Sequence, residues 1–392
     1  MGKDLTNSNS LIVGFVTMLV IGTDLFVVSP LLPQMSAAFG VSVGTAGLSV
    51  TVFSLAYVIG APLFGMAGDK VGHRLVLTLG LISFGVANLL TAGAPTFPTF
   101  MLARALTGIA AAASSPSVYA LVGHTAPAGK RGAWMSTVVA GFLISLTTGA
   151  PTGMYISEIS GWREVFLVIG ILAFVVAALN FLSWPARGAH RPKQVTTTPL
   201  SAKLRAVSVT GTWGFSVYAF YTYLGAGLQL DAGFSSALTA AALIIYGIGA
   251  VVGSLSGGRL ADRFGPGRIA TASLILLSIL ELVSAATLRG PHSLIMALLG
   301  VFAVAAYPCL PAYQARLVEN FPGEGGSIMA WNSCVMYLGT SLGAACGGLV
   351  LSRFGFSAVP IFGAIIGILG SYLCLSWRRD TREVHAQQVS AE

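Results

Sequence analysis

Twelve long apolar stretches constrain this chain more than any other feature of its sequence. Each approaches the length of about 20 residues that a helix needs to cross the hydrocarbon core of a bilayer. A helix also satisfies its own backbone hydrogen bonds, as any segment in lipid must. We therefore predict an all-α polytopic membrane protein with twelve transmembrane helices. Their expected centres lie near Ile21, Ala56, Phe84, Ala111, Phe142, Leu172, Phe220, Ile248, Ile279, Val304, Leu338 and Ile366.

Composition supports this class. Hydrophobic residues make up 55% of the 392 residues and charged residues 9%, whereas about a quarter of the residues in soluble domains are charged. The 48 glycines are compatible with membrane helices, where small residues allow close packing. The four cysteines lie in expected spans without the spacing of metal ligands, so we predict no disulfide framework, no metal site and no bound cofactor.

The basic residues predict the orientation. If the N-terminus is cytoplasmic, 17 of the 21 lysines and arginines fall in cytoplasmic segments, and Arg163, Arg289 and Arg353 fall outside. Such a bias follows the positive-inside rule, so both termini are expected in the cytoplasm. The same bias accounts for the net charge of +8, and nucleic acid is not an expected partner.

A polar, basic segment divides the chain into two similar halves. Residues 187–205 read as a cytoplasmic linker between six-helix bundles at residues 1–186 and 206–392. The pattern Gly65, Asp69, Gly72 after the second span recurs as Gly258, Asp262, Gly265 after the eighth, displaced by 193 residues. Repeated halves predict a transporter built on pseudo-symmetry.

These motifs resemble the major facilitator superfamily. The signature of that family between spans 2 and 3 is similar to the run Gly65, Asp69, Lys70, Gly72 and Arg74, with a degenerate copy at Asp262 and Arg263. Three further motifs resemble those of the family: Arg104-x-x-x-Gly108 in span 4; Gly149-Ala150-Pro151-Thr152-Gly153 in span 5 with Gly141 upstream; and Gly161-Trp162-Arg163-x-x-Phe166 opening span 6. The span-5 motif is associated with antiporters, although Ala150 interrupts its usual Gly-Pro pair. The span-6 motif is common among exporters.

The loop signature is expected to act as a gate. By resemblance, the cluster around Asp69 is a latch that stabilises one of the alternating states. A carboxylate there can complement a helix N-terminus, and Lys70 and Arg74 can pair with neighbouring helices. The alternative interpretation is a basic loop that is simply retained in the cytoplasm.

Asp24 and Arg104 carry charge inside predicted spans, where it is costly and marks functional sites. Counting from Leu32 and Phe97 at 1.5 Å per residue places them about 12 Å and about 11 Å deep. In the resembled fold, spans 1 and 4 line the central cavity. The hypothesis is that Asp24 is the protonatable coupling residue and that Arg104 pairs with it; a permanent structural ion pair is the alternative.

Glu281 is the third charge inside a span. Ser278, Ser284 and Ala285 share its helical face, so it is expected to point into protein. Two roles stay open for it, a structural hydrogen bond or a second proton site.

Glycines of spans 5 and 11 predict close helix packing. Gly339, Gly343 and Gly347 recur every four residues, a spacing that lets helix backbones approach. By resemblance, these two spans lie at the interface between the halves. Pro308 and Pro311 are expected to break span 10 and free carbonyls towards a cavity. The expected substrate-binding residues are Tyr218, Tyr221, Tyr307, Trp331, Asn332 and Tyr337.

The sequence and the resemblance together predict a secondary active transporter of the twelve-span drug:proton antiporter group. It would be a monomer in a bacterial inner membrane that exports a small amphipathic compound, with the proton as coupling ion. The alternative is a sugar, amino-acid or other metabolite exporter or symporter of the same fold. A primary pump would need a phosphate-binding loop, which is not found. A channel and a membrane-embedded enzyme are less favoured because the gate motif is repeated and no catalytic group is found within the spans.

Overall fold

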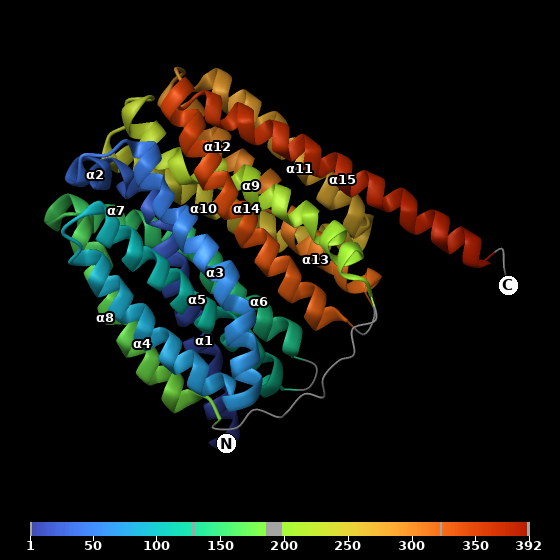
Figure 1. The fold of residues 1–392 in the computed structure, drawn as a ribbon. Coiled ribbons are helices and arrows are strands. Elements are labelled where there is room, and N and C mark those ends of the chain that lie inside the picture. Colours follow the sequence, from blue (N-terminus) through green and yellow to red (C-terminus); the bar gives the residue numbers. More distant parts are fainter. Residues whose placement is uncertain (1, 128–129, 186–197, 322–323, 390–392) are drawn as a thin grey trace. The chain divides into compact units, whose positions relative to one another are not determined.

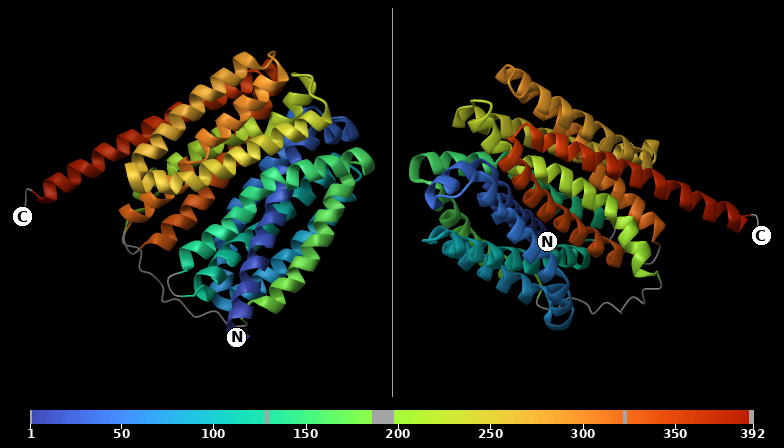
Figure 2. Two further views of the ribbon diagram at one scale, coloured as in Figure 1. Left: turned by 180° about the vertical axis from the view of Figure 1, so that it is seen from behind. Right: turned by 45° about the horizontal axis from the view of Figure 1, so that its top comes forward.

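The computed structural model describes residues 2–127, 130–185, 198–321 and 324–389, and the described chain is helical without strands (Figure 1). The helices of each part lie side by side as a bundle (Figures 1 and 2). They are α1 (Gly2–Phe26), α2 (Val28–Phe39), α3 (Val43–Val71), α4 (His73–Ala92), α5 (Phe97–Thr125), α6 (Arg131–Thr147), α7 (Gly149–Ser160), α8 (Trp162–Ser183), α9 (Leu200–Leu230), α10 (Ser236–Phe264), α11 (Pro266–Thr287), α12 (His292–Ala306), α13 (Cys309–Asn320), α14 (Gly325–Phe354) and α15 (Ala358–Val389).

The predicted spans are present, and three of them are broken. Within the described residues, 11 helical segments are long and apolar enough to cross a membrane. The span expected near Phe220 is the helix α9, which is 31 residues long but is not among those 11 segments. The first, fifth and tenth expected spans are the pairs α1–α2, α6–α7 and α12–α13.

Prolines explain the breaks, because proline removes a backbone donor and frees the carbonyl four residues earlier. Pro30 follows the α1–α2 break, and the carbonyl of Phe26 instead accepts a hydrogen bond from the Tyr221 hydroxyl at 3.2 Å. At the α12–α13 break, the Ala306 carbonyl accepts from Trp213 Nε1 at 2.9 Å. The predicted break of span 10 is confirmed, since α12 ends at Ala306 and α13 begins at Cys309. That the carbonyls freed by Pro308 and Pro311 face a cavity stays a prediction.

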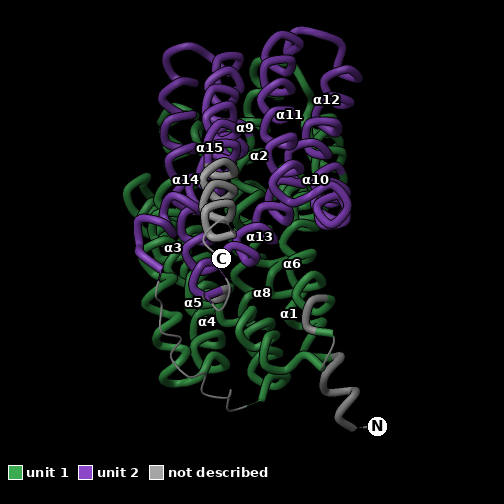
Figure 3. Tube along the Cα trace, turned by 90° about the vertical axis from the view of Figure 1, so that its right-hand side faces the viewer, with its two compact units in different colours: residues 1–193, 221–248 green, residues 194–220, 249–392 purple. Residues whose placement is uncertain are grey.

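The chain forms two compact units, which Figure 3 shows in different colours. Unit 1 contains residues 1–193 and 221–248, and unit 2 contains residues 194–220 and 249–392. The end of α9 and the start of α10 thus belong to unit 1. The division into bundles at residues 1–186 and 206–392 stays a prediction, and most of the expected linker lies outside the described residues.

A buried ion pair anchors the start of α9 within unit 2. Lys203 contacts the Glu324 carboxylate, whose other oxygen accepts hydrogen bonds from the backbone N–H and the hydroxyl of Thr198, both at 2.9 Å. Both charged side chains are buried, so each depends on its partner.

Replacing Glu324 by glutamine is expected to lower the free energy of unfolding by about 2 kcal/mol, because hydrogen bonds to a charged group are lost. Thermal unfolding of the purified protein in detergent measures the change. The matched control is Glu319→Gln, at an exposed position on α13, which should change stability by less than about 0.5 kcal/mol. Equal effects of the two variants would contradict the anchoring role.

Candidate functional site

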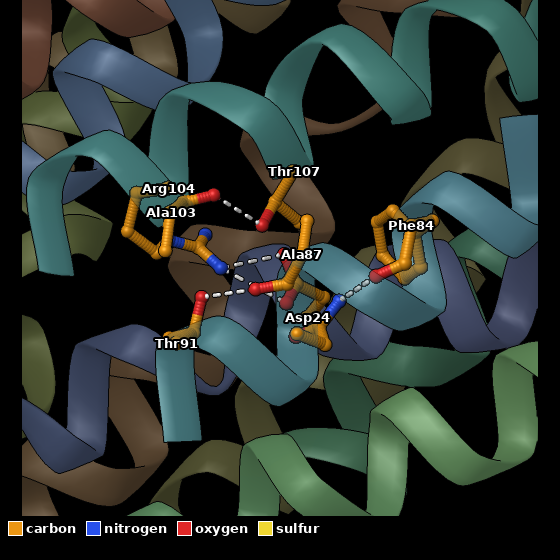
Figure 4. A network of polar contacts seen from close by, with 8 residues as sticks. Asp24, Phe84, Ala87, Thr91, Ala103, Arg104 and Thr107 are labelled. Carbon is orange, nitrogen blue, oxygen red and sulfur yellow. Dashed lines mark hydrogen bonds and ion pairs between the residues drawn. The ribbon is translucent and has the colours of Figure 1, made fainter. Parts of the chain in front are cut away.

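The two buried charges of unit 1 lie in direct contact. Nη1 of Arg104 is 2.9 Å from each carboxylate oxygen of Asp24, and both side chains are 0% exposed. Figure 4 shows Arg104 pointing at Asp24 between the helices that carry Thr91 and Thr107. A buried ion pair of this kind offsets the cost of placing each charge in a low-dielectric interior.

Local structure positions both residues. α5 begins in a capping box between Thr96 and Thr99, so Arg104 lies two turns into the helix. One turn later, a Cβ on Gly108 would overlap the carbonyl group of Phe53. Only glycine allows α5 to approach the backbone of α3 this closely. The Arg104-x-x-x-Gly108 pattern therefore brings the arginine against α3.

The depths predicted for the two charges need correction. α2 continues to Phe39, well beyond Leu32, and Phe39 lies beside Phe97 with ring centroids 5.9 Å apart. Counted from that level, Asp24 is deeper in its helix than Arg104 is in α5. The long arginine side chain and the break between α1 and α2 still allow the two groups to meet.

Aromatic rings enclose the guanidinium group. The Cζ atom of Arg104 is 5.0 Å from the ring centroid of Phe53 on α3 and 5.5 Å from that of Phe166 on α8. Cation–π contacts of this kind stabilise a desolvated cation. Nε and Nη2 of Arg104 find no hydrogen-bond acceptor within the described chain. The pair is thus enclosed inside unit 1, and three arginine N–H groups face aromatic walls.

Asn88 on α4 completes this site, and sequence reasoning missed it. Its side-chain amide interacts with the Asp24 carboxylate and also donates to the Phe84 carbonyl at 3.0 Å. Its own carbonyl oxygen is buried without a donor among the described residues. A polar residue in the middle of an apolar span is the signal that could have found it.

The span-6 motif builds one wall of the site. Trp162 packs edge-on against Phe100 at 5.7 Å and against Phe166 at 6.0 Å. Arg163 donates to the Ala94 carbonyl at 2.7 Å, which ties the start of α8 to the turn before α5. The motif therefore holds Phe166 where its ring faces Arg104.

The span-5 glycines pack against α1. A Cβ on Gly141 would overlap the Phe15 carbonyl oxygen, one on Gly149 the Thr23 side chain, and one on Gly153 the Val27 side chain. The spacing is the same on both helices, so the α6–α7 pair and α1 run parallel in close contact. Pro151 lies within this face, in α7.

Gly339 and Gly343 of α14 pack in the same way inside unit 2. A Cβ on either would overlap a backbone carbonyl of α9, at Gly211 or Phe215 respectively. These glycines join two helices of the same unit, because the small side chains are needed where those backbones cross. The expectation that the helices of spans 5 and 11 lie at the interface between the halves stays a prediction.

The gate signature is exposed at the junction of α3 and α4. Asp69 lies in the last turn of α3, is 76% exposed and faces His73 at 3.3 Å. It does not cap α4, whose N-cap residue Gly72 has no side-chain hydrogen bond. Arg74 packs over the Phe181 ring at 4.2 Å. In the second copy, Asp262 and Arg263 are exposed, as are Lys70 and Asp69. The latch role stays a prediction.

The expected substrate-binding residues divide between the units. Tyr221 belongs to unit 1, and the other five belong to unit 2. Asn332 accepts a hydrogen bond from Thr210 at 2.5 Å, and Tyr307 packs edge-on against Trp213 at 5.6 Å. Tyr218 and Tyr337 are buried, whereas Trp331 is exposed. Their role in binding stays a prediction.

Glu281 bonds to a residue that sequence reasoning did not name. Both of its carboxyl oxygens lie near the Ser216 hydroxyl of α9, at 3.1 and 2.9 Å. The expectation that it points into protein is confirmed, since the residue is 0% exposed.

Comparison with known proteins identifies the family. The model of the Major Facilitator Superfamily matches residues 14–245 and residues 206–392. The chain belongs to the Major Facilitator Superfamily. It is 31% identical over 369 residues to the uncharacterized MFS-type transporter YwfA of Bacillus subtilis, covering 90% of this chain and 88% of that one. It is 29% identical over 360 residues to the inner membrane transport protein YdhP of Escherichia coli K12, covering 90% and 92%.

Solved structures agree on the fold. The human organic anion transporter MFSD10 superposes with a TM-score of 0.71 at 19% identity, covering 94% of this chain and 99% of that one. A bacterial homologue of the human lysosomal transporter Spinster gives a TM-score of 0.75 at 16% identity, covering 95% and 97%. The chain is thus a multi-pass membrane transporter of this superfamily, and its relatives are named as transporters rather than enzymes.

Proposed function

We propose that this superfamily member is a proton-coupled antiporter that exports a small amphipathic compound by alternating access. The single observation that carries the proposal is the buried contact between Asp24 and Arg104. A carboxylate held inside a membrane bundle by one guanidinium is a group whose protonation changes the charge of the site.

Protonation of Asp24 would weaken its attraction to Arg104. The carboxylate takes up one proton, the ion pair becomes a contact between a neutral acid and a cation, and the guanidinium loses its counter-charge. A buried cation without a counter-charge is costly, so the helices that carry the pair are driven to rearrange. Release of the proton on the other side restores the pair and resets the cycle.

The span-5 glycines support coupling between this pair and a helix movement. Gly149 packs directly on Thr23, the neighbour of Asp24 on α1. A shift of α7 against α1 would therefore move the backbone that carries the carboxylate. The resemblance of this motif to those of antiporters favours export over uptake.

Bacterial relatives favour an inner-membrane location. We propose that the chain works there as a monomer, with both termini in the cytoplasm and without a bound cofactor. The aromatic residues Tyr218, Tyr221, Tyr307, Trp331 and Tyr337, together with Asn332, are proposed to contact the substrate, because stacking surfaces with few charges suit an amphipathic solute.

Reconstitution tests the function. Purified protein in proteoliposomes is screened with cationic dyes, sugars and amino acids under an imposed pH gradient. The wild type should move a dye against its gradient, and Asp24→Asn should keep downhill exchange of that dye but lose the response to the pH gradient. Normal gradient-driven transport by a stably folded Asp24→Asn variant would refute the coupling role. Gradient-driven movement of sugars or amino acids alone would favour the alternative of a metabolite transporter.

A further inference from the structure

Buried polar residues occupy equivalent positions in the two halves of the chain. The displacement of 193 residues that relates Asp69 to Asp262 also relates Asn88 to Glu281 and Gly170 to Gly363. In unit 1, Gly170 packs beside Leu89, the neighbour of Asn88. In unit 2, a Cβ on Gly363 of α15 would come within 2.6 Å of the Glu281 carboxyl group. Glu281 thus occupies the place in unit 2 that Asn88 occupies in unit 1.

The partners of these residues also correspond. Asn88 of α4 interacts with Asp24 of α1. Glu281 of α11 contacts Ser216 of α9, and Ser216 is the repeat equivalent of Thr23, the neighbour of Asp24. Each unit therefore has one buried carboxyl group among these equivalent positions. It is Asp24 on the first helix of unit 1 and Glu281 on the third membrane-spanning helix of unit 2.

The geometry around Glu281 fits a neutral acid. Ser216 has one hydroxyl hydrogen, yet its oxygen lies 3.1 and 2.9 Å from the two carboxyl oxygens. One contact can use the serine hydrogen. The other is favourable when the carboxyl group carries a proton and donates it to the serine oxygen. A carboxylate would accept both contacts as one bifurcated hydrogen bond from the single serine hydrogen, with no second hydrogen bond to offset its charge.

Among the residues that the structure describes, no cation forms an ion pair with Glu281. Its polar contacts within the described chain are those with Ser216. Arg205 on α9 lies 11 residues from Ser216, and Arg316 on α13 bonds to Cys374, 11 residues along α15 from Gly363. Along a helix, a separation of 11 residues corresponds to about 16 Å.

On α9, Tyr218 lies two residues after Ser216, and on α15 the charged residues begin at Arg378, 15 residues after Gly363. The remaining charged residues and histidine on the described parts of the packed helices lie closer to helix ends. They are Lys203 on α9, Arg268 on α11, His292 on α12 and Glu319 on α13, and Arg289 follows the end of α11. None of them forms an ion pair with Glu281. The isolated charged form would be strongly disfavoured at such a position.

We infer that Glu281 is a second proton-binding site of the transport cycle, in which the proton is shared with Ser216. This inference rests on the proposed function. One proton is carried at Asp24 in unit 1 and another at Glu281 in unit 2, so that two protons are exchanged for each substrate. Binding adds a proton to one carboxyl oxygen, and release leaves the carboxylate.

A route from this site to the helix break is present in unit 2. Ser216 lies one turn from Trp213 on α9, and Trp213 donates to the Ala306 carbonyl at the α12–α13 break. Ser273, two turns before Glu281 on α11, donates to the same carbonyl at 3.1 Å. Loss of the proton from Glu281 would remove one of the two hydrogen bonds between α9 and α11, and both helices contact the break.

The limiting substrate gradient in proteoliposomes measures the number of coupled protons. With a pH gradient of about one unit and no membrane potential, each coupled proton multiplies the limiting concentration ratio by about ten for an uncharged substrate. We expect Glu281→Gln, which mimics the neutral acid, to lower that ratio about tenfold while substrate binding and downhill exchange persist. An unchanged ratio would overturn the inference. Asp24→Asn is measured in parallel: an unaltered ratio in that variant refutes the proposed function instead.

Ser216→Ala provides a readout that does not depend on how well Glu281→Gln folds. Infrared spectra of the reconstituted protein at neutral pH should contain a protonated-carboxyl C=O band, because Glu281 carries its proton. In Ser216→Ala this band should shift to higher frequency, because the hydrogen bonds with the hydroxyl are lost. A spectrum without a protonated-carboxyl band, or a band that Ser216→Ala leaves in place, would overturn the inference.

Discussion

Replacing Arg104 by leucine is expected to lower the free energy of unfolding by about 3–5 kcal/mol and to abolish transport. The substitution leaves Asp24 buried without a counter-charge, and breaking a buried pair on one side has a cost of this size. It also removes the cation from between the rings of Phe53 and Phe166. Thermal unfolding in detergent and substrate flux in proteoliposomes measure the two effects.

The double variant Asp24→Asn with Arg104→Gln separates structure from coupling. Two neutral amides can hydrogen-bond to each other, and replacing both members of a buried pair is far less destabilising than replacing one. We expect most of the stability to return together with downhill exchange, but no response to a pH gradient. A double variant that regains gradient-driven transport would show that the pair is only structural.

Replacing Gly141 by alanine is expected to lower the free energy of unfolding by about 1–3 kcal/mol and to slow transport strongly. The added Cβ would overlap the backbone carbonyl oxygen of Phe15. Backbone cannot move aside as a flexible side chain can, so α6 must separate from α1, and overpacking of this kind has a cost of that order. Unfolding temperature and initial rates of transport are the measurements.

Gly123→Ala is the matched control. Gly123 lies within α5, and a Cβ there would meet no other atom within 4 Å. Alanine is favoured over glycine in helices by about 1 kcal/mol, so this variant should be as stable as the wild type or slightly more stable. Similar losses in both variants would contradict the close approach of α6 and α1 as the cause.

The sequence predicted the helices of this protein better than their contacts. Hydropathy located the apolar spans, and Pro308 and Pro311 marked the break of span 10, because both signals act within one helix. The break before Pro30 was not predicted. The partners of the span-5 and span-11 glycines likewise came only from the structure. The spacing of Gly339 and Gly343 predicts that a helix packs closely, but it carries no information about which helix is the partner.

In the candidate site, too, the sequence indicated the charged residues but not the residues that surround them. Charged residues inside apolar spans pointed to Asp24, Arg104 and Glu281, since such groups are too costly to lie there without a reason. Asn88, Phe53 and Ser216 were not found, and Phe166 was named only as part of a motif. A phenylalanine or serine in a span is ordinary until its neighbours are known, and of these residues only Asn88 carried a signal of its own.

The sequence by itself determined the class of the protein. A bilayer imposes length, hydropathy and internal hydrogen bonding on each segment separately, so those properties can be read locally. Only the tertiary structure decided that Arg104 contacts Asp24 between aromatic rings and that Glu281 faces Ser216, with no cation beside it in the described chain. The Arg104–Asp24 and Glu281–Ser216 contacts join residues 80 and 65 positions apart. They depend on how the helices cross, a property of the packed bundle rather than of any one segment.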